Sequence, residues 1–266
     1  MILKIKKTKV WYYFLSFIVI PIYDFFWKNI INFKGRILYF QWFKRDRDYF
    51  DLEKNGGILK INNIDTFTKL SNEILNACTQ KIIAKAENKI NTPSYAYNES
   101  NNVENKYTTP IFNDLNIDIK KKIIDFASSE LMISTAAKYL GVYPILSRVE
   151  VEYNIPKNYE NKRGAMMFHK DEFGYKSMDI FMAITNIDEN TGPLKGIKTK
   201  FDHLGPFARI IKEEKTVIPG NRGKVKDENI LENKNLLNEM ITIEGKSGTA
   251  ILIDSFKCYH AGGHCK

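Results

Sequence analysis

The spacing of apolar residues changes once along this chain, and that change limits the folds it can adopt. Over residues 115–140 apolar residues recur every three or four positions, as on one face of a helix. Over residues 147–154 ("SRVEVEYN") they alternate with Arg and Glu, which is typical of a strand with one buried face. Helical patterns dominate before this point and strand patterns after it. The sequence therefore predicts an α+β protein with helices packed on one side of a β-sandwich or barrel.

Individual elements can be predicted on both sides of the change. Asp65 is expected to cap a helix whose apolar positions are Phe67, Leu70, Ile74 and Leu75. Residues 88–109 are polar and predict a long loop, and Gly141 predicts a helix end. Strands are expected at residues 58–61 and 177–187. The segment "MITIEGKSGTAILID" predicts a strand, a turn between Gly245 and Gly248, and a second strand.

Composition narrows the function classes. The 266 residues are 44% hydrophobic, which is enough for one large domain, and the formal net charge is +9. The lysines are spread along the chain without a zinc-finger, RNP or arginine-rich motif, so no nucleic-acid partner is predicted. Three cysteines without regular spacing argue against a disulfide framework and favour a cytoplasmic location.

Residues 1–48 form a basic and aromatic N-terminal segment that precedes the predicted domain of residues 49–266. An apolar run over residues 10–22 is shorter than the roughly 20 residues that a spanning helix needs, and Pro21 and Asp24 interrupt it. Basic residues flank it on both sides. Two interpretations stay open: residues 1–34 contact the cytoplasmic face of a membrane peripherally, or the segment packs against the domain.

The stretch "MMFHKDEF" places His169 and Asp171 one residue apart. In an extended chain, residues i and i+2 point to the same side, so their imidazole and carboxylate can face one point. His260 follows the last predicted strand and is the candidate third ligand. Two histidines and one carboxylate form the facial triad of non-heme Fe(II) oxygenases, whereas a structural zinc site is closed by four ligands.

The segment "FHKDEFGYKSMDIFMAITNIDENTGPL" resembles the core of the phytanoyl-CoA dioxygenase-like family of Fe(II)/2-oxoglutarate oxygenases. "GTAILIDSFKCYHAGG" is similar to the family's distal block, "GNRGKVKDE" to an intermediate block, and "NGGILKINNID" to its usual start. The blocks follow one another in the family's order. The resemblance covers about residues 50–266.

This resemblance implies a double-stranded β-helix, the jelly-roll or cupin-like barrel, flanked by helices. It implies that His169, Asp171 and His260 ligate Fe(II). The activity would be hydroxylation of a C–H bond in a small organic or lipid-like substrate, using O₂ and converting 2-oxoglutarate to succinate. In related halogenases a small residue replaces the aspartate, so Asp171 favours hydroxylation.

One part of the family pattern is missing. An arginine about ten residues beyond the distal histidine binds the far carboxylate of 2-oxoglutarate in the family, but this sequence ends at Lys266. The last barrel strand is therefore expected to be absent, and the domain to be C-terminally incomplete. Lys176 is a candidate substitute for the arginine, and a solvated loop lysine is the alternative interpretation.

Alternatives to the hydroxylase also remain. The chain could be a non-catalytic or truncated oxygenase fold that serves as a binding or scaffold module, or a membrane-bound interaction protein. His264 and His203 are expected at the surface or the site rim, and Cys258 and Cys265 as thiols rather than zinc ligands. The sequence does not determine the substrate or the oligomeric state.

Overall fold

A computed structural model of the protein describes residues 20–91, 108–154, 156, 164–171, 176–198, 230, 232, 234–263 and 265. The described helices are α2 (Ile20–Phe26), the π-helix η2 (Trp27–Ile31), α3 (Phe33–Trp42), α4 (Asp65–Ala77), α5 (Gln80–Asn91), η4 (Phe112–Asp114), α6 (Ile117–Ala127), α7 (Glu130–Leu140), η5 (Gly164–Met166) and α10 (Lys234–Asn238). The described strands are β1 (Ile58–Ile61), β2 (Thr108–Pro110), β3 (Glu152–Asn154), β4 (Asp179–Met182), β5 (Lys195–Ile197), β6 (Met240–Thr242), β7 (Ala250–Ile253) and β8 (His260–Ala261).

Strand β7 is at the centre of the fold. It lies between β1 and β4 in an antiparallel sheet of order β1-β7-β4, and all four of its residues are buried. Ala250 and Leu252 pack with Phe67 of α4 and Met132 of α7. The alternate residues Ile251 and Ile253 pack on the opposite side with Ile58, Ile243 and other apolar residues. Both faces of β7 are covered, which explains its continuous apolar sequence.

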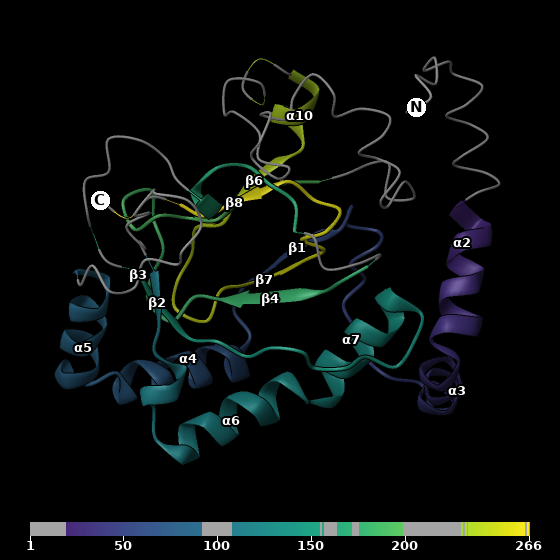
Figure 1. The fold of residues 1–266 in the computed structure, drawn as a ribbon, viewed down its shortest axis with the longest axis horizontal. Coiled ribbons are helices and arrows are strands. Elements are labelled where there is room, and N and C mark those ends of the chain that lie inside the picture. The colour runs from purple at the N-terminus through teal and green to yellow at the C-terminus, as the bar shows by residue number, and fades with distance from the viewer. Residues whose placement is uncertain are drawn as a thin grey trace, which may run out of the picture.

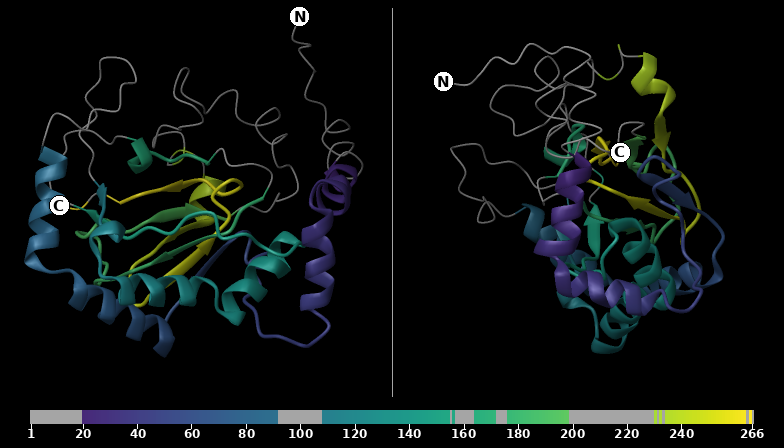
Figure 2. Two further views of the ribbon diagram at one scale, coloured as in Figure 1. Left: turned by 60° about the horizontal axis from the view of Figure 1, so that its bottom comes forward. Right: turned by 90° about the vertical axis from the view of Figure 1, so that its right-hand side faces the viewer.

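The two faces of β7 are covered by two different layers of the fold (Figure 1). Helices α4, α6 and α7 lie along one side of the sheets, as Figure 2 also shows. A second antiparallel sheet of order β6-β5-β8 lies on the other side. Gly196 of β5 permits close approach of the two sheets, because a Cβ there would lie 2.7 Å from Cδ1 of Ile58. Strands β2 and β3 form a separate pair.

The α+β class is confirmed, and α4, α6 and α7 lie on one side of the sheets as predicted, whereas α10 lies beyond the second sheet. The described strands form three small antiparallel sheets and no closed barrel, so the double-stranded β-helix stays a prediction. The predicted turn between Gly245 and Gly248 does not join a hairpin. Strand β6 pairs with β5, and β7 pairs with β1 and β4, so the chain changes sheets at this turn.

Several element boundaries differ from the prediction. Helix α4 has Ile64 at its N-cap without a side-chain hydrogen bond, and Asp65 instead contributes negative charge to the first turn. Leu75 is exposed, unlike Phe67, Leu70 and Ile74. Helix α5 takes in the first residues of the predicted loop, β2 begins at Thr108, and residues 92–107 lie outside the described part. Only Glu152–Asn154 of the predicted strand 147–154 is β structure.

The end of α7 follows the prediction. Gly141 is the C-cap residue, and its φ of 73° is in the left-handed region that glycine adopts without a steric penalty. The N-terminal helices lie beside this end (Figure 1). Trp42 donates a hydrogen bond from Nε1 to Ser134 Oγ at 3.0 Å, and the Tyr143 amide donates to the Gly35 carbonyl at 2.8 Å. Among the described helices, none combines the length and the apolar character required to cross a bilayer.

Candidate metal centre

A pair of main-chain hydrogen bonds joins the two segments that carry His169 and His260. The amide of His169 donates to the carbonyl of His260, and the amide of His260 donates to the carbonyl of His169, both at 2.9 Å. This is one antiparallel bridge, so the two side chains leave on the same side. The imidazole ring centroids are 4.3 Å apart, with 48° between the ring planes. The backbone thus brings together two residues that are far apart in the sequence.

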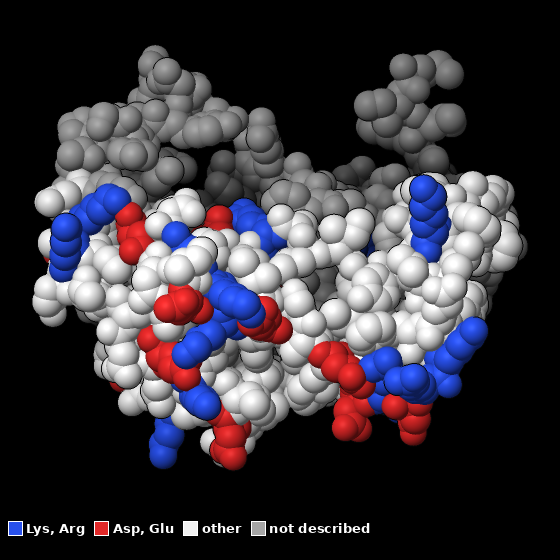
Figure 3. All heavy atoms as spheres, turned by 90° about the horizontal axis from the view of Figure 1, so that it is seen from below, with Lys and Arg blue, Asp and Glu red and all other residues white. Residues whose placement is uncertain are grey.

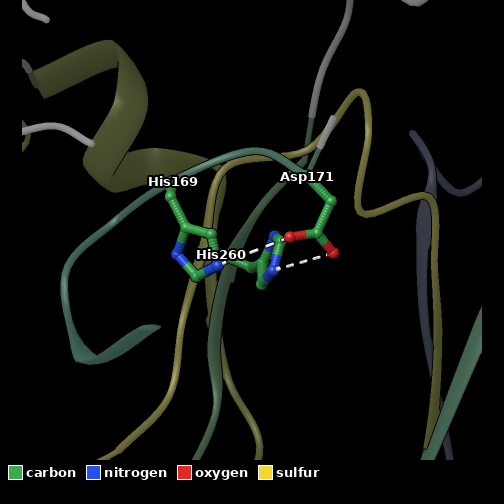
Figure 4. Close-up of side chains that lie close together, drawn as sticks. All are labelled: His169, Asp171 and His260. Carbon is green, nitrogen blue, oxygen red and sulfur yellow. Dashed lines mark ion pairs between the residues drawn. The ribbon is translucent and has the colours of Figure 1, made fainter. Parts of the chain in front are cut away.

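Asp171 is two residues beyond this bridge, and its side chain points back to the imidazoles (Figure 4). Its amide donates to the Ser255 carbonyl at 2.9 Å, which fixes the extended stretch. One carboxylate oxygen is 3.6 Å from His169 Nε2, and the other is 3.8 Å from His260 Nε2. Both distances are too long for hydrogen bonds. The three candidate ligand atoms lie within 4.8 Å of one another, so this group can hold a metal ion.

The orientation of each imidazole is set by a carbonyl two residues earlier in the chain. His169 Nδ1 is 2.8 Å from the Met167 carbonyl oxygen, and His260 Nδ1 is 3.2 Å from the Cys258 carbonyl oxygen. A carbonyl only accepts, so each Nδ1 carries the proton and donates. In a neutral imidazole the Nε2 lone pair is then available. Metal-binding histidines are commonly oriented by a donor bond from the other ring nitrogen in this way.

His260 favours its neutral form more than a free imidazole does. Its side chain is buried, and burial lowers the pKa of its imidazole, with the neighbouring His169 adding to this effect and the Asp171 carboxylate opposing it. A neutral His260 has no proton on Nε2 to share with Asp171. The Nε2 lone pair of a neutral His260 therefore faces the Asp171 carboxylate, an arrangement that a cation stabilises. The donor set fits a metal ion on this ground.

Of the predicted site residues, His169, Asp171 and His260 come together, and Lys176 is placed in a different cluster. Its Nζ lies over the Tyr139 ring, 4.0 Å from the centroid. Its electrostatic neighbours include Lys257 and Asp254. Burial, with repulsion from Lys257, lowers the pKa of Lys176 to about 8. The role of Lys176 in binding 2-oxoglutarate stays a prediction.

His203 and His264 lie outside the described residues. The three cysteines form no disulfide. The Cys258 thiol lies 3.5 Å from the Gly56 carbonyl oxygen, and the three-residue ligand group contains no sulfur. A Cβ on Gly263 would lie 1.9 Å from the carbonyl carbon of Gly192, so glycine at this position permits a close approach between two main chains.

Sequence reasoning missed the polar residues that support the ligand segments. Asp254 is fully buried, and it accepts hydrogen bonds from the Tyr139 hydroxyl and from the amides of Phe256 and Lys257. The Cys258 amide donates to the Asp254 carbonyl at 2.9 Å. Asp254 thus shapes the turn that leads from β7 to His260. An Asp-Ser pair directly after an apolar strand is a turn signature that could have revealed it.

Ser255 connects this turn to Asp171. Its carbonyl accepts from the Asp171 amide, and its hydroxyl donates to the Asp179 carboxylate at the start of β4. Burial raises the pKa of Asp179, the Ser255 hydroxyl opposes the rise, and the negative charge of Asp171 adds to it. The Asp171 segment is therefore attached both to the turn after β7 and, through Ser255, to β4.

Comparison with protein-family models and with curated proteins finds no match for this chain.

Proposed function

We propose that this protein is a non-heme Fe(II)- and 2-oxoglutarate-dependent dioxygenase that hydroxylates a C–H bond of a small organic or lipid-like substrate. The observation that carries the proposal is the convergence of His169, Asp171 and His260, with both imidazoles oriented through Nδ1. Two nitrogens and one carboxylate are the donor set of the Fe(II) facial triad.

The composition of the group favours iron over structural zinc. The ligand group among the described residues has three members, whereas a structural zinc site has four and commonly includes cysteines. A three-ligand face leaves coordination positions for a chelating co-substrate and O₂. The carboxylate of Asp171 occupies the position that a halide-binding enzyme of this kind would leave free, which supports hydroxylation.

When bound, Fe(II) with 2-oxoglutarate and O₂ would supply an oxidative decarboxylation, giving succinate and CO₂, coupled to oxidation of the substrate. The chain's own residues would prepare the site for it. Asp171 would offset the metal's positive charge. The Met167 and Cys258 carbonyls orient the two imidazoles so that their Nε2 atoms face one point. The Ser255 carbonyl keeps the Asp171 backbone extended.

The family's double-stranded β-helix belongs to the same proposal. Two stacked antiparallel sheets with the ligand histidines at the edge of one of them support it. We propose Lys176 as the candidate cation for the far carboxylate of 2-oxoglutarate.

The test is succinate release from 2-oxoglutarate by the purified chain with Fe(II) and ascorbate. We expect Fe(II)-dependent turnover that falls at least about 100-fold in His169→Ala and in Asp171→Ala. Asp125→Ala, which removes an exposed carboxylate on α6, is the matched control and should keep full turnover. Undiminished turnover in both ligand variants would refute the assignment. Metal binding by a folded wild type that fails to bind or decarboxylate 2-oxoglutarate would favour the non-catalytic alternative.

A further inference from the structure

The helices α2, η2 and α3 expose an unusual number of large apolar side chains. Nine of the sixteen large hydrophobic residues that are exposed in the described part of the chain lie between residues 22 and 40. The most exposed include Ile31 at 66%, Phe25 at 60% and Phe33 at 58%. Contiguous exposed apolar surface of this kind marks an interaction site rather than ordinary protein surface.

Other helices divide their apolar residues between the core and the surface. Helix α6 buries Ile119 and Ile123 and exposes Ile117 and Ile124. Helix α3 has no buried residue, although Phe33, Ile37, Leu38 and Phe40 make it as apolar as a core helix. The apolar residues of α3 surround the helix instead of forming one stripe against the domain.

Positive charge lies beside the apolar surface. Residues 20–47 contain six basic residues and two acidic ones. A hollow of about 450 Å³ at the C-terminal end of α3 is lined by Trp42, Tyr143, Lys44, Arg45 and others. Within the described part of the chain, the side chains of Lys44 and Arg45 make no ion pair and are exposed. Figure 3 shows a broad uncharged surface on the right, with basic and acidic side chains together along its lower edge.

We propose that this N-terminal face (residues 22–47) docks onto an anionic lipid bilayer. The apolar side chains of α2, η2 and α3 enter the interfacial layer, and Lys44 and Arg45 contact headgroup phosphates at the basic hollow. Aromatic residues are favoured at the level of the headgroups, and cationic residues near the surface are attracted to anionic lipid.

A second copy of this chain is a poorer partner for the N-terminal face than an anionic bilayer. In a two-fold symmetric dimer the same face meets itself, so the excess of basic residues would be brought together. Like charges brought into contact across an interface oppose association. The residues that precede this face in the sequence add four lysines and no acidic residue over residues 1–19, which strengthens the preference for an anionic surface.

The experiment is co-sedimentation of the full chain with vesicles of phosphatidylcholine, with and without about 30 mol% phosphatidylserine. We expect binding to the anionic vesicles at least about tenfold tighter than to the neutral ones, and weaker binding as salt rises from about 0.1 to about 0.5 M. The charge variant Lys44→Gln/Arg45→Gln should lose about tenfold or more in affinity and some of the salt dependence. The apolar variant Phe33→Ser/Phe40→Ser should bind more weakly at every salt concentration.

Matched controls remove similar groups elsewhere. Ile117→Ser/Ile145→Ser removes two exposed apolar side chains, and Lys81→Gln/Lys121→Gln removes two exposed lysines. Both controls should bind as the wild type does. The proposal is overturned if neither test variant weakens binding, or if the wild type binds neutral and anionic vesicles equally. It is also overturned if the wild type does not bind vesicles and instead self-associates, and Phe33→Ser/Phe40→Ser abolishes that self-association.

Discussion

Asp171 and Asp254 are two aspartates close to one turn of the chain, and their surroundings differ completely. The Asp254 carboxylate is fully buried, and a hydroxyl and two amides donate hydrogen bonds to it. The Asp171 carboxylate is partly exposed and faces the Nε2 atoms of two imidazoles at 3.6 and 3.8 Å, which is beyond hydrogen-bond distance. The first carboxylate already has its partners within the protein. The second needs a cation, which separates a structural aspartate from a candidate ligand more clearly than burial does.

The largest expected effect is on metal affinity. Asp171→Ala removes the only anionic donor of the ligand group and should weaken Co(II) binding, measured by calorimetry, at least about 100-fold. Asp254→Asn should change that affinity far less, because the asparagine oxygen can still accept from the Phe256 and Lys257 amides. If both variants lose affinity equally, the distinction between the two aspartates fails.

Stability of the metal-free protein should show the opposite order. Asp254→Ala removes the buried carboxylate that accepts from the Tyr139 hydroxyl and the Phe256 amide, and we expect the free energy of unfolding to fall by about 2–4 kcal/mol. Asp171→Ala should leave it unchanged or slightly raised, because its carboxylate is partly exposed and accepts no hydrogen bond within the described residues. Urea unfolding in the presence of a chelator measures both. Asp254→Asn, with its acceptor retained, should fall between them.

The smallest expected effect is a pH dependence contributed by Lys176. Its pKa in the folded state is lowered to about 8 from 10.5, so between these values the unfolded chain binds the proton more tightly. The stability contribution of Lys176 is therefore least favourable below pH 8 and rises as the pH increases from 8 to 10.5. The difference in unfolding free energy between wild type and Lys176→Met should change in the wild type's favour over this window. A difference that is flat with pH would show that Lys176 is well solvated and not part of the buried cluster.

The sequence predicted the class of the fold and the members of the ligand group, because both depend on short patterns. The change from helical to alternating spacing near residue 141 marks the change from α7 to the strands. The His-x-Asp spacing places two side chains on one side of an extended segment, and His260 follows the last long strand, β7. These features follow from local backbone geometry.

Pairings between distant segments could not be predicted in this way. The turn between Gly245 and Gly248 has the composition of a hairpin turn. However, β6 pairs with β5 and β7 pairs with β4, and Ile251 and Ile253 of β7 pack between the two sheets. The donors to Asp254 come from α7 and from the following turn, and nothing near Tyr139 in the sequence indicates that contact. Whether the N-terminal segment is exposed or packed against the domain stayed open, because apolar content alone does not tell which faces of a helix are covered.

The bridge between His169 and His260 is made by main-chain atoms, and this has a consequence for how the centre can change. Substitution at position 171 or in the surrounding loop leaves the reciprocal amide–carbonyl pair intact, and with it the spacing of the two imidazoles. Donor identity and donor placement are thus controlled by separate parts of the chain. Under the proposed function, an exchange of residue 171 would change the third ligand, and with it the metal preference, while the backbone register still places the two histidines.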